Sequence, residues 1–321
     1  MDNLYLNIGF LVLGTLILIY AAKYLVEGLI GIAARLAVTP FILAMLIISI
    51  DLEVFGPAVI GSYQNLTALS FGSILGTVAF LILLALGSAA AIYPIEHPDF
   101  PLKYIFIFGG VIALVFALSL DGKISRTDAV IALVVYFIYI VYLIRDLGRT
   151  RAAKSEIEEA EGEVSEIVKE PTWHFPLMLI GGLIGLVIGS LLVIKGVRVC
   201  LGVCGLAETL LGVTLLAIAV NSVELVEAII PAKKGHSEVV IGNVAGSCVF
   251  QLLFTLGIAA LIRPLQVEPV ALYYVFPAIT FSWLLLVVVV WHGKTPRWAG
   301  VVLMALYIFF VTGTVILGLR I

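Results

Sequence analysis

The feature that most constrains the fold of this chain is its series of long apolar runs. Each run is about 20 residues long and lacks the alternation of a half-buried strand. Lipid offers no partner to an exposed backbone polar group, so such runs are predicted to be membrane-spanning helices. We therefore predict an all-α polytopic membrane protein with ten transmembrane helices, at roughly 4–33, 38–62, 67–93, 103–120, 126–145, 175–203, 206–232, 237–262, 269–291 and 298–319.

Composition agrees with a lipid-embedded chain. Of 321 residues, 62% are hydrophobic and 12% are charged, whereas a soluble domain is about half apolar and about a quarter charged. We expect the lipid bilayer and inorganic cations as partners, a monomer, no nucleic acid and no cofactor. The histidines lie in loops or at span ends, and none forms a His-Glu cluster at mid-membrane, so we do not expect an enzyme; they are His97, His174, His236 and His292.

One long polar stretch divides the chain. It runs from Arg145 to His174 and is rich in glutamate. We interpret it as a solvated connector, because like charges in a row repel one another. The predicted organisation is a first membrane repeat at 1–145, a connector at 146–174 and a second membrane repeat at 175–321.

Lysine and arginine counts predict the orientation. With the N-terminus outside, four basic residues fall in outer loops, at Lys123, Arg126, Arg263 and Arg320. Eleven fall on the inner side, at Arg35, Lys103, Arg145, Arg149, Arg151, Lys154, Lys169, Lys233, Lys234, Lys294 and Arg297. We expect a multi-pass protein of the cell membrane with both termini outside and a cytoplasmic connector.

Five spans in each half make the second half enter the membrane from the opposite side, and the sequence contains a matching repeat. Residues in the first half recur at a constant offset (242 − 72 = 170): Gly72, Gly76, Thr77, Leu86, Gly87, Ala89, Ala90 and Pro94 match Gly242, Gly246, Ser247, Leu256, Gly257, Ala259, Ala260 and Pro264. Inverted repeats with polar, interrupted helices are typical of secondary transporters.

Two acidic residues lie inside the predicted spans and match across the repeat. Glu53 and Glu224 are separated by 171 positions (224 − 53) and are flanked by apolar sequence. A charge at this depth costs about 3 kcal/mol on insertion scales, so such residues normally face an ion, a cavity or a partner. We predict that both carboxylates bind one divalent cation. Asp51 is a third acidic candidate, and we expect it to point to a different face because it lies two residues from Glu53.

Further oxygen ligands are expected beside these acids, because Ca²⁺ prefers six to eight oxygens. Ser49 lies one helical turn before Glu53, and Asn221 lies within one turn before Glu224. Thr77 and Ser247 adjoin the paired glycines, and Gln251 follows Ser247 by one turn.

The second repeat carries the clearest motif, Gly-Asn-Val-Ala-Gly-Ser at 242–247, with a relaxed copy at 72–77. With the layout of the chain, it resembles the sodium/calcium exchanger family of the calcium/cation antiporter superfamily. The resemblance implies a Ca²⁺ antiporter that works by alternating access, with Glu53 and Glu224 as Ca²⁺ ligands, helped by Ser49, Thr77, Asn221, Ser247 and Gln251.

The family's other motif, Gly-Thr-Ser-x-Pro-Glu, is eroded at 48–53 and 219–224, where only the glutamates are fully retained. Leu81 replaces an oxygen-bearing residue, which Gln251 retains in the second repeat. Two close carboxylates repel each other without a metal, so protons could be the counter-substrate instead of the favoured Na⁺. A transport-inactive relative that only binds divalent cations is the remaining alternative.

Overall fold

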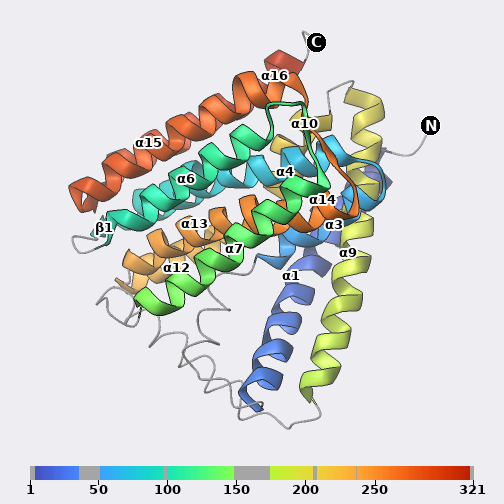
Figure 1. The fold of residues 1–321 in the computed structure, drawn as a ribbon, viewed down its shortest axis with the longest axis horizontal. Coiled ribbons are helices and arrows are strands. Elements are labelled where there is room, and N and C mark those ends of the chain that lie inside the picture. Colours follow the sequence, from blue (N-terminus) through green and yellow to red (C-terminus); the bar gives the residue numbers. More distant parts are fainter. Residues whose placement is uncertain are drawn as a thin grey trace.

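The computed structural model describes residues 4–35, 51–96, 100–147, 174–204, 208–235 and 237–318, which are mainly helical (Figure 1). Labels with α denote α-helices, and labels with η denote π-helical segments. The first half contains α1 (Leu4–Arg35), α3 (Leu52–Tyr63), α4 (Thr67–Ala79), η1 (Phe80–Ala85), α5 (Leu86–Ile92), α6 (Leu102–Leu118) and α7 (Arg126–Leu147).

The second half contains a similar series of elements. Its helices are α9 (His174–Cys204), α10 (Glu208–Leu211), η2 (Gly212–Leu216), α11 (Ala217–Val220), α12 (Ser222–Lys234), α13 (Ser237–Val249), η3 (Phe250–Thr255), α14 (Leu256–Ile262), η4 (Ala271–Val275), α15 (Phe276–His292) and α16 (Arg297–Gly318). Short strands β1 (Ile95–Glu96), β2 (Lys123–Ile124), β3 (Leu265–Gln266) and β4 (Lys294–Thr295) follow the helix ends.

Seven helical stretches in the described residues are long and apolar enough to cross a membrane, and they coincide with seven of the predicted spans. An eighth candidate is bent by 52° between Glu208–Val220 and Ser222–Lys233. The apolar helix α6 coincides with the predicted span at 103–120. Helix α3 covers the second half of the predicted span at 38–62, whose first part lies outside the described residues.

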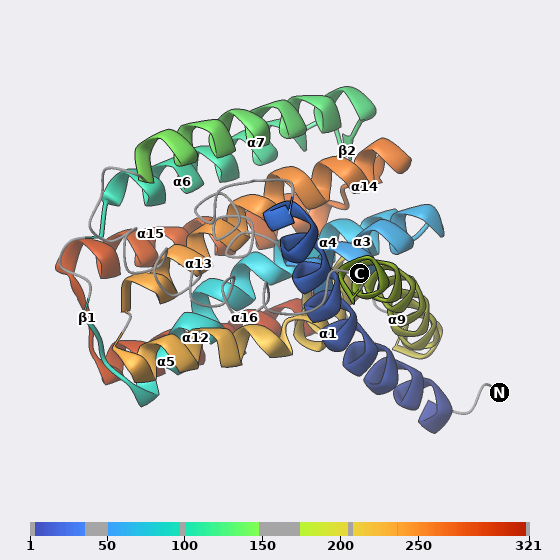
Figure 2. The ribbon, with the colours of Figure 1, turned by 90° about the horizontal axis from the view of Figure 1, so that it is seen from below.

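The stretch formed by α4, η1 and α5 lies at the centre of the bundle. All residues of α4 are buried, and this central stretch packs against helices from both halves of the chain. Figure 2 shows α6 and α7 on one side of α13 and α14, with α5, α12 and α16 on the other side. The centre of the protein is therefore built jointly by the two halves.

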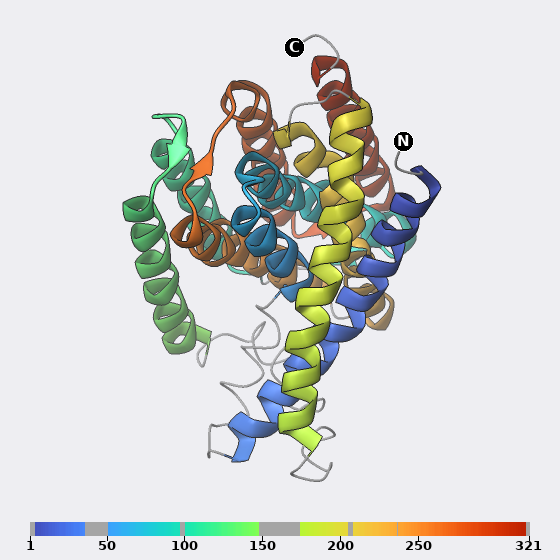
Figure 3. The same ribbon diagram turned by 90° about the vertical axis from the view of Figure 1, so that its right-hand side faces the viewer.

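Helices α1 and α9 form a pair that crosses the other helices steeply (Figures 1 and 3). Glycines bring the two backbones together: a Cβ atom at Gly14 would lie 2.8 Å from Gly189 O, and one at Gly182 would lie 2.9 Å from Ala21 O. Small residues allow this close packing in membranes, where the hydrophobic effect does not drive helix association. The pair has its own apolar cluster, shared with parts of α3, α4 and the η2–α11 segment.

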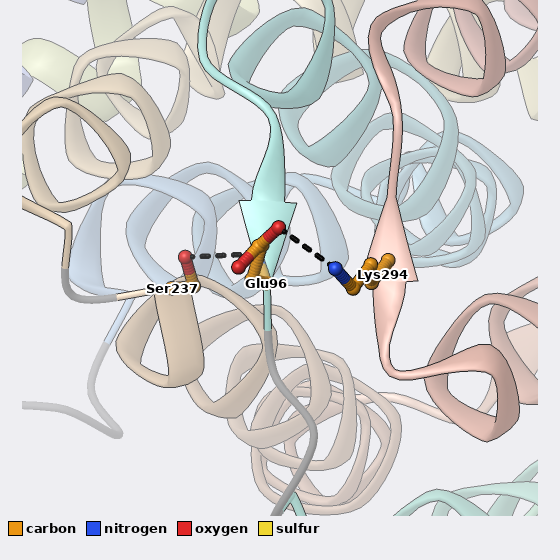
Figure 4. Close-up of polar contacts among 3 residues, drawn as sticks. All are labelled: Glu96, Ser237 and Lys294. Atoms are coloured by element: carbon orange, nitrogen blue, oxygen red, sulfur yellow. Dashed lines mark hydrogen bonds and ion pairs between the residues drawn. The ribbon is translucent and has the colours of Figure 1, made fainter.

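Two strand pairs join the halves at the helix ends. β1 pairs with β4 and β2 pairs with β3, both antiparallel. At the first pair, Lys294 Nζ donates to Glu96 Oε1 (3.1 Å) and Glu96 N donates to Ser237 Oγ (3.2 Å; Figure 4). The second pair has a related contact, from Gln266 N to Thr67 Oγ1 (3.4 Å).

These elements recur at nearly constant spacing. The offset is 170 from α4 to α13 (237 − 67), from η1 to η3 (250 − 80) and from β1 to β3 (265 − 95), and 171 from α7 to α16 (297 − 126). The π-helical segments therefore occupy matching positions in the central helices of both halves.

The central helix crossing yields a stability prediction. A Cβ atom at Gly76 would lie 2.6 Å from Val213 Cα and 2.8 Å from Ala217 Cβ, whereas one at Gly110, on the exposed face of α6, would meet no described atom within 4 Å. Gly76→Ala should therefore destabilise the purified protein by roughly 1–3 kcal/mol through overpacking. Gly110→Ala should be neutral or stabilising, because alanine favours a helix. Equal thermal unfolding midpoints for the two variants would contradict this account of the crossing.

Candidate cation-binding site

Polar side chains gather at the centre of the bundle, where α3 and α12 begin. Asp51, which precedes α3, and Glu224, in the first turn of α12, are each 5% exposed. Their neighbours Thr77, Asn221, Ser247 and Gln251 are fully buried. Polar groups are rarely buried in this number inside a membrane protein unless they serve a site.

Asp51 is held by donors from the second half of the chain. Ser247 Oγ donates to Asp51 Oδ1 (3.1 Å), and Gln251 Nε2 donates to Asp51 Oδ2 (3.3 Å). The same amide also lies 3.4 Å from the backbone oxygen of Asp51. These bonds join the start of α3 to α13 and η3, so both halves of the chain build this part of the site.

Asn221 makes a corresponding contact with the first half. Its Nδ2 donates to Thr77 Oγ1 (2.8 Å) and to Ala217 O (2.6 Å). Ala217 O also accepts the backbone N–H of Asn221 (3.1 Å), so main chain and side chain of Asn221 both bind this carbonyl next to the break between α11 and α12, where the bent span changes direction. An asparagine that binds its own backbone in this way favours a helix break over a continuous helix.

The two contacts are related by the offset of the fold. Asp51 corresponds to Asn221 (221 − 51 = 170) and Thr77 corresponds to Ser247 (247 − 77 = 170), so Asp51–Ser247 and Asn221–Thr77 are equivalent pairs. Helices α3 and α12 also begin 170 residues apart (222 − 52). In this register Glu53 takes the place of Val223 rather than that of Glu224.

The carboxyl groups of Asp51 and Glu224 meet within hydrogen-bonding reach. Two ionised carboxylates repel at this distance, so the contact requires either a shared proton or a cation between them. The N-terminal ends of α3 and α12 lie beside these groups and carry partial positive charge that favours anions. The positive helix ends and the hydroxyl and amide donors compensate part of the negative charge.

Several buried oxygens of the site have no hydrogen-bond donor among the described residues. They are Asn221 Oδ1, Glu224 Oε2 and Gln251 Oε1. Amide oxygens and the oxygens of an ionised carboxylate can only accept hydrogen bonds, and leaving one unsatisfied in the interior costs about 1–3 kcal/mol. A bound cation is one partner that such oxygens accept.

The donor set is built from oxygen. Within the described ranges, no three His, Cys, Asp or Glu side chains converge on a metal position. A cation here would therefore rely on two carboxylates together with amide, hydroxyl and backbone oxygens. Hard cations such as Ca²⁺ accept this mixture, whereas thiophilic metals favour sulfur and imidazole ligands.

The structure places the remaining predicted residues in different ways. Ser49 lies outside the described residues. Glu53 is partly buried in the first turn of α3, within electrostatic reach of Asp51 and Glu227. Asp51, the third acidic candidate, which we expected on a different helix face from Glu53, contacts Glu224, Ser247 and Gln251. The sequence signal for its position is the offset of 170 residues, which pairs Asp51 with Asn221. Residue type instead pairs Glu53 with Glu224.

Membrane-spanning helices around a buried site of acidic and amide groups define a multi-pass ion-transport protein. The model of the family described as sodium/calcium exchanger protein matches residues 6–145 and 174–316. This chain therefore belongs to the sodium/calcium exchanger family, a family of membrane antiporters.

Individual relatives align over nearly the full length. The chain is 27% identical to the membrane protein MJ0091 of Methanocaldococcus jannaschii, covering 96% of this chain and 98% of that protein. It is 24% identical to the sodium/calcium exchanger MaX1 of Methanosarcina acetivorans, covering 95% and 97%. A solved structure of the sodium-calcium exchanger NCX_Mj has the same fold, with a TM-score of 0.62, 24% identity and coverage of 97% and 99%.

The carboxyl contact yields a prediction for Asp51→Asn. An amide at position 51 can donate to Glu224, and Gln251 can rotate so that its unpartnered Oε1 accepts. The cation-free protein should become more stable by about 1 kcal/mol, the scale of one hydrogen bond, and should no longer gain stability from added Ca²⁺. Thermal unfolding in detergent, with and without Ca²⁺, measures both effects.

Glu96→Gln is the control for Asp51→Asn, since it removes one acidic charge from the exposed strand pair far along the chain from the site. It should change stability by less than about 1 kcal/mol and should leave the response to Ca²⁺ intact. An Asp51→Asn variant that is stabilised by Ca²⁺ as strongly as the wild type would exclude Asp51 as a ligand.

Proposed function

We propose that the protein is a secondary active antiporter that exchanges Ca²⁺ for a monovalent cation by alternating access, with Na⁺ favoured. The observation that carries this proposal is the buried contact between the Asp51 and Glu224 carboxyl groups, surrounded by unpartnered amide and carboxyl oxygens. Two carboxylates neutralise one divalent cation, and the neutral oxygens supply further coordination.

The proposed architecture has ten transmembrane helices in two inverted five-helix repeats. The seven long stretches, the bent span, α6 and the span that ends with α3 make up ten. The recurring elements and the two related strand pairs support a pseudo-two-fold relation between the halves. An odd number of spans in each repeat requires opposite orientations, which suits a site reached alternately from both sides.

The moving part is proposed to be the α1–α9 pair. These helices share close glycine contacts, so they can move as one body. Helix α9 of the pair contacts α3 at Gly56. A Cβ atom added at Gly56 would lie 2.5 Å from Ser190 Oγ and 3.0 Å from Leu186 Cγ, both in α9. A helix surface without a side chain at this point lets α9 slide past α3, which would open the site to one side at a time.

The two halves differ in what they offer to a monovalent ion. Leu81, fully buried, stands at the position that corresponds to Gln251 (251 − 81 = 170). We therefore place any Na⁺ site beside Asn221, Ser247 and Gln251, and we expect fewer Na⁺ ions per Ca²⁺ than in relatives with oxygen ligands in both halves. The Leu81→Asn variant should strengthen competition by Na⁺ if the residue at 81 limits that half.

Proton drive is the second candidate, and the carboxyl contact itself favours it. A hydrogen bond between Asp51 and Glu224 needs a proton on one of them. Binding of Ca²⁺ between the two groups would release that proton, which couples the two ions directly.

Ion-driven flux distinguishes these possibilities. Purified protein in sealed liposomes should take up radioactive Ca²⁺ when an outward Na⁺ gradient is imposed. Uptake driven only by a pH jump would establish proton exchange instead. The Glu224→Gln variant should lose uptake under either gradient, because the second-half carboxylate that meets Asp51 is removed.

Two further outcomes decide the remaining alternatives. Ca²⁺ binding in titration calorimetry without flux under any gradient would identify a transport-inactive binding protein. A wild-type protein that binds no Ca²⁺ would contradict the proposal itself.

We also propose that the protein lies in the cell membrane with both termini outside. The first residues of α1 and the last of α16 lie at the same end of the bundle (Figure 3), which agrees with an even number of spans. The lysine and arginine bias then assigns that end to the outside. Protease added to intact cells should leave the connector at 146–174 uncut, and cleavage there from outside would reverse the orientation.

A further inference from the structure

Four aromatic rings pack together beside the hydrogen bonds between Asp51 and Gln251. Phe55 comes from α3, Tyr136 from α7, and Phe250 and Phe254 from η3. The Phe254 ring centroid lies 5.9 Å from that of Phe55, 5.1 Å from that of Phe250 and 5.2 Å from that of Tyr136. We refer to these four residues as the aromatic cover.

The aromatic cover is joined to the site through the backbone. Gln251 lies directly after Phe250 in η3, and Phe254 follows it by three residues. Phe55 N donates to Asp51 O (3.3 Å), so the Phe55 ring is one helical turn from the Asp51 carboxylate. The three phenylalanines of the aromatic cover thus lie within about one helical turn of Asp51 or Gln251 along the chain, and Tyr136 is within electrostatic reach of Asp51.

Phe55 also lies where the core meets the α1–α9 pair. It packs against the apolar cluster of the core and against the apolar cluster of the pair. Phe55 and Phe254, whose rings stack, are partly exposed, whereas Asp51 and Gln251 are buried. The two stacked rings therefore reach the protein surface while the polar side chains close to them along the chain do not.

The corresponding positions in the other half form only part of such a cover. Phe250 and Tyr136 correspond to Phe80 (250 − 80 = 170) and Tyr307 (307 − 136 = 171), whose ring centroids lie 5.7 Å apart, but the other two positions are not aromatic. Phe55 corresponds to Leu225 (225 − 55 = 170) and Phe254 corresponds to Leu84 (254 − 84 = 170). On that side the position of Gln251 is taken by Leu81. Phe55 and Phe254 therefore occur on the side of the site that contains Gln251. Core packing alone does not require phenylalanine, since leucine occupies the corresponding positions 225 and 84.

We propose that the aromatic cover determines divalent-cation selectivity by excluding water from Asp51 and Gln251, so that Ca²⁺ is accepted and Mg²⁺ is rejected. This inference rests on the proposed function. A Mg²⁺ ion sheds its waters reluctantly and demands near-octahedral geometry, whereas Ca²⁺ accepts irregular oxygen sets. Phenylalanine rings offer no hydrogen-bond partner to a retained water, and apolar constrictions in ion pathways exclude water in the same way.

Competition between the two cations tests the proposal in Phe55→Ala and Phe254→Ala. Dissociation constants for Ca²⁺ and Mg²⁺ are measured by calorimetry on the purified, folded protein. The preference for Ca²⁺ over Mg²⁺ should fall by about tenfold in each variant, the scale that one retained water contributes. The controls are the twin substitutions Leu225→Ala and Leu84→Ala, which also truncate an apolar side chain and should keep the preference within about twofold.

An unchanged preference in folded Phe55→Ala and Phe254→Ala would overturn the inference. So would an equal loss in the Leu225→Ala and Leu84→Ala controls, since selectivity would then depend on packing in general. If the alanine variants fail to fold, the same measurement is made on Phe55→Leu and Phe254→Leu. The preference for Ca²⁺ over Mg²⁺ should again fall, and both variants should fold, because leucine occupies the corresponding positions 225 and 84. A wild-type protein that binds neither cation would instead refute the proposed function.

Discussion

The contact between the Asp51 and Glu224 carboxyl groups is the interaction on which the rest of the structure depends. Two acidic groups buried at the centre of a membrane protein are costly unless their charge is compensated. The fold supplies this compensation from several directions: the N-terminal ends of two helices, the hydroxyl of Ser247 and the amide of Gln251 all converge on them. Among the described residues, Asn221 Oδ1, Glu224 Oε2 and Gln251 Oε1 have no hydrogen-bond partner, and a bound cation would complete the balance of charge.

Elements that recur at a nearly constant offset in the two halves bring the site residues together, and the two halves differ in the side chains they contribute. Asp51–Ser247 and Asn221–Thr77 are equivalent contacts, yet one contains an acid where the other contains an amide. The strand pairs differ similarly, because the pair shown in Figure 4 carries the Glu96–Lys294 ion pair while its counterpart has glutamine. Matching backbones with different side chains allow one scaffold to hold two unlike half-sites.

Most of the fold follows from the sequence, because long apolar runs in lipid can form only a few structures. Seven predicted spans agree with continuous helices, and the polar pair Asn221–Ser222 marks the bend in another. The partner of Glu224 was harder to predict. Glu53 matches it in residue type, whereas Asp51 reaches it through the point at which α3 begins. Aligning the two halves with an offset of 171 instead of 170 changes which first-half residue corresponds to Glu224. Residue type alone does not determine which offset applies at this position.

The most direct test of the account is to locate the bound ion. We expect an experimental structure of the protein with Mn²⁺, whose anomalous scattering marks its position, to show one ion between Asp51 and Glu224. Both carboxylates should lie within about 2.6 Å of it, the range of hard-cation coordination. An ion held by Glu53 and Glu224 with Asp51 turned away, or an empty centre at saturating Mn²⁺, would contradict the account.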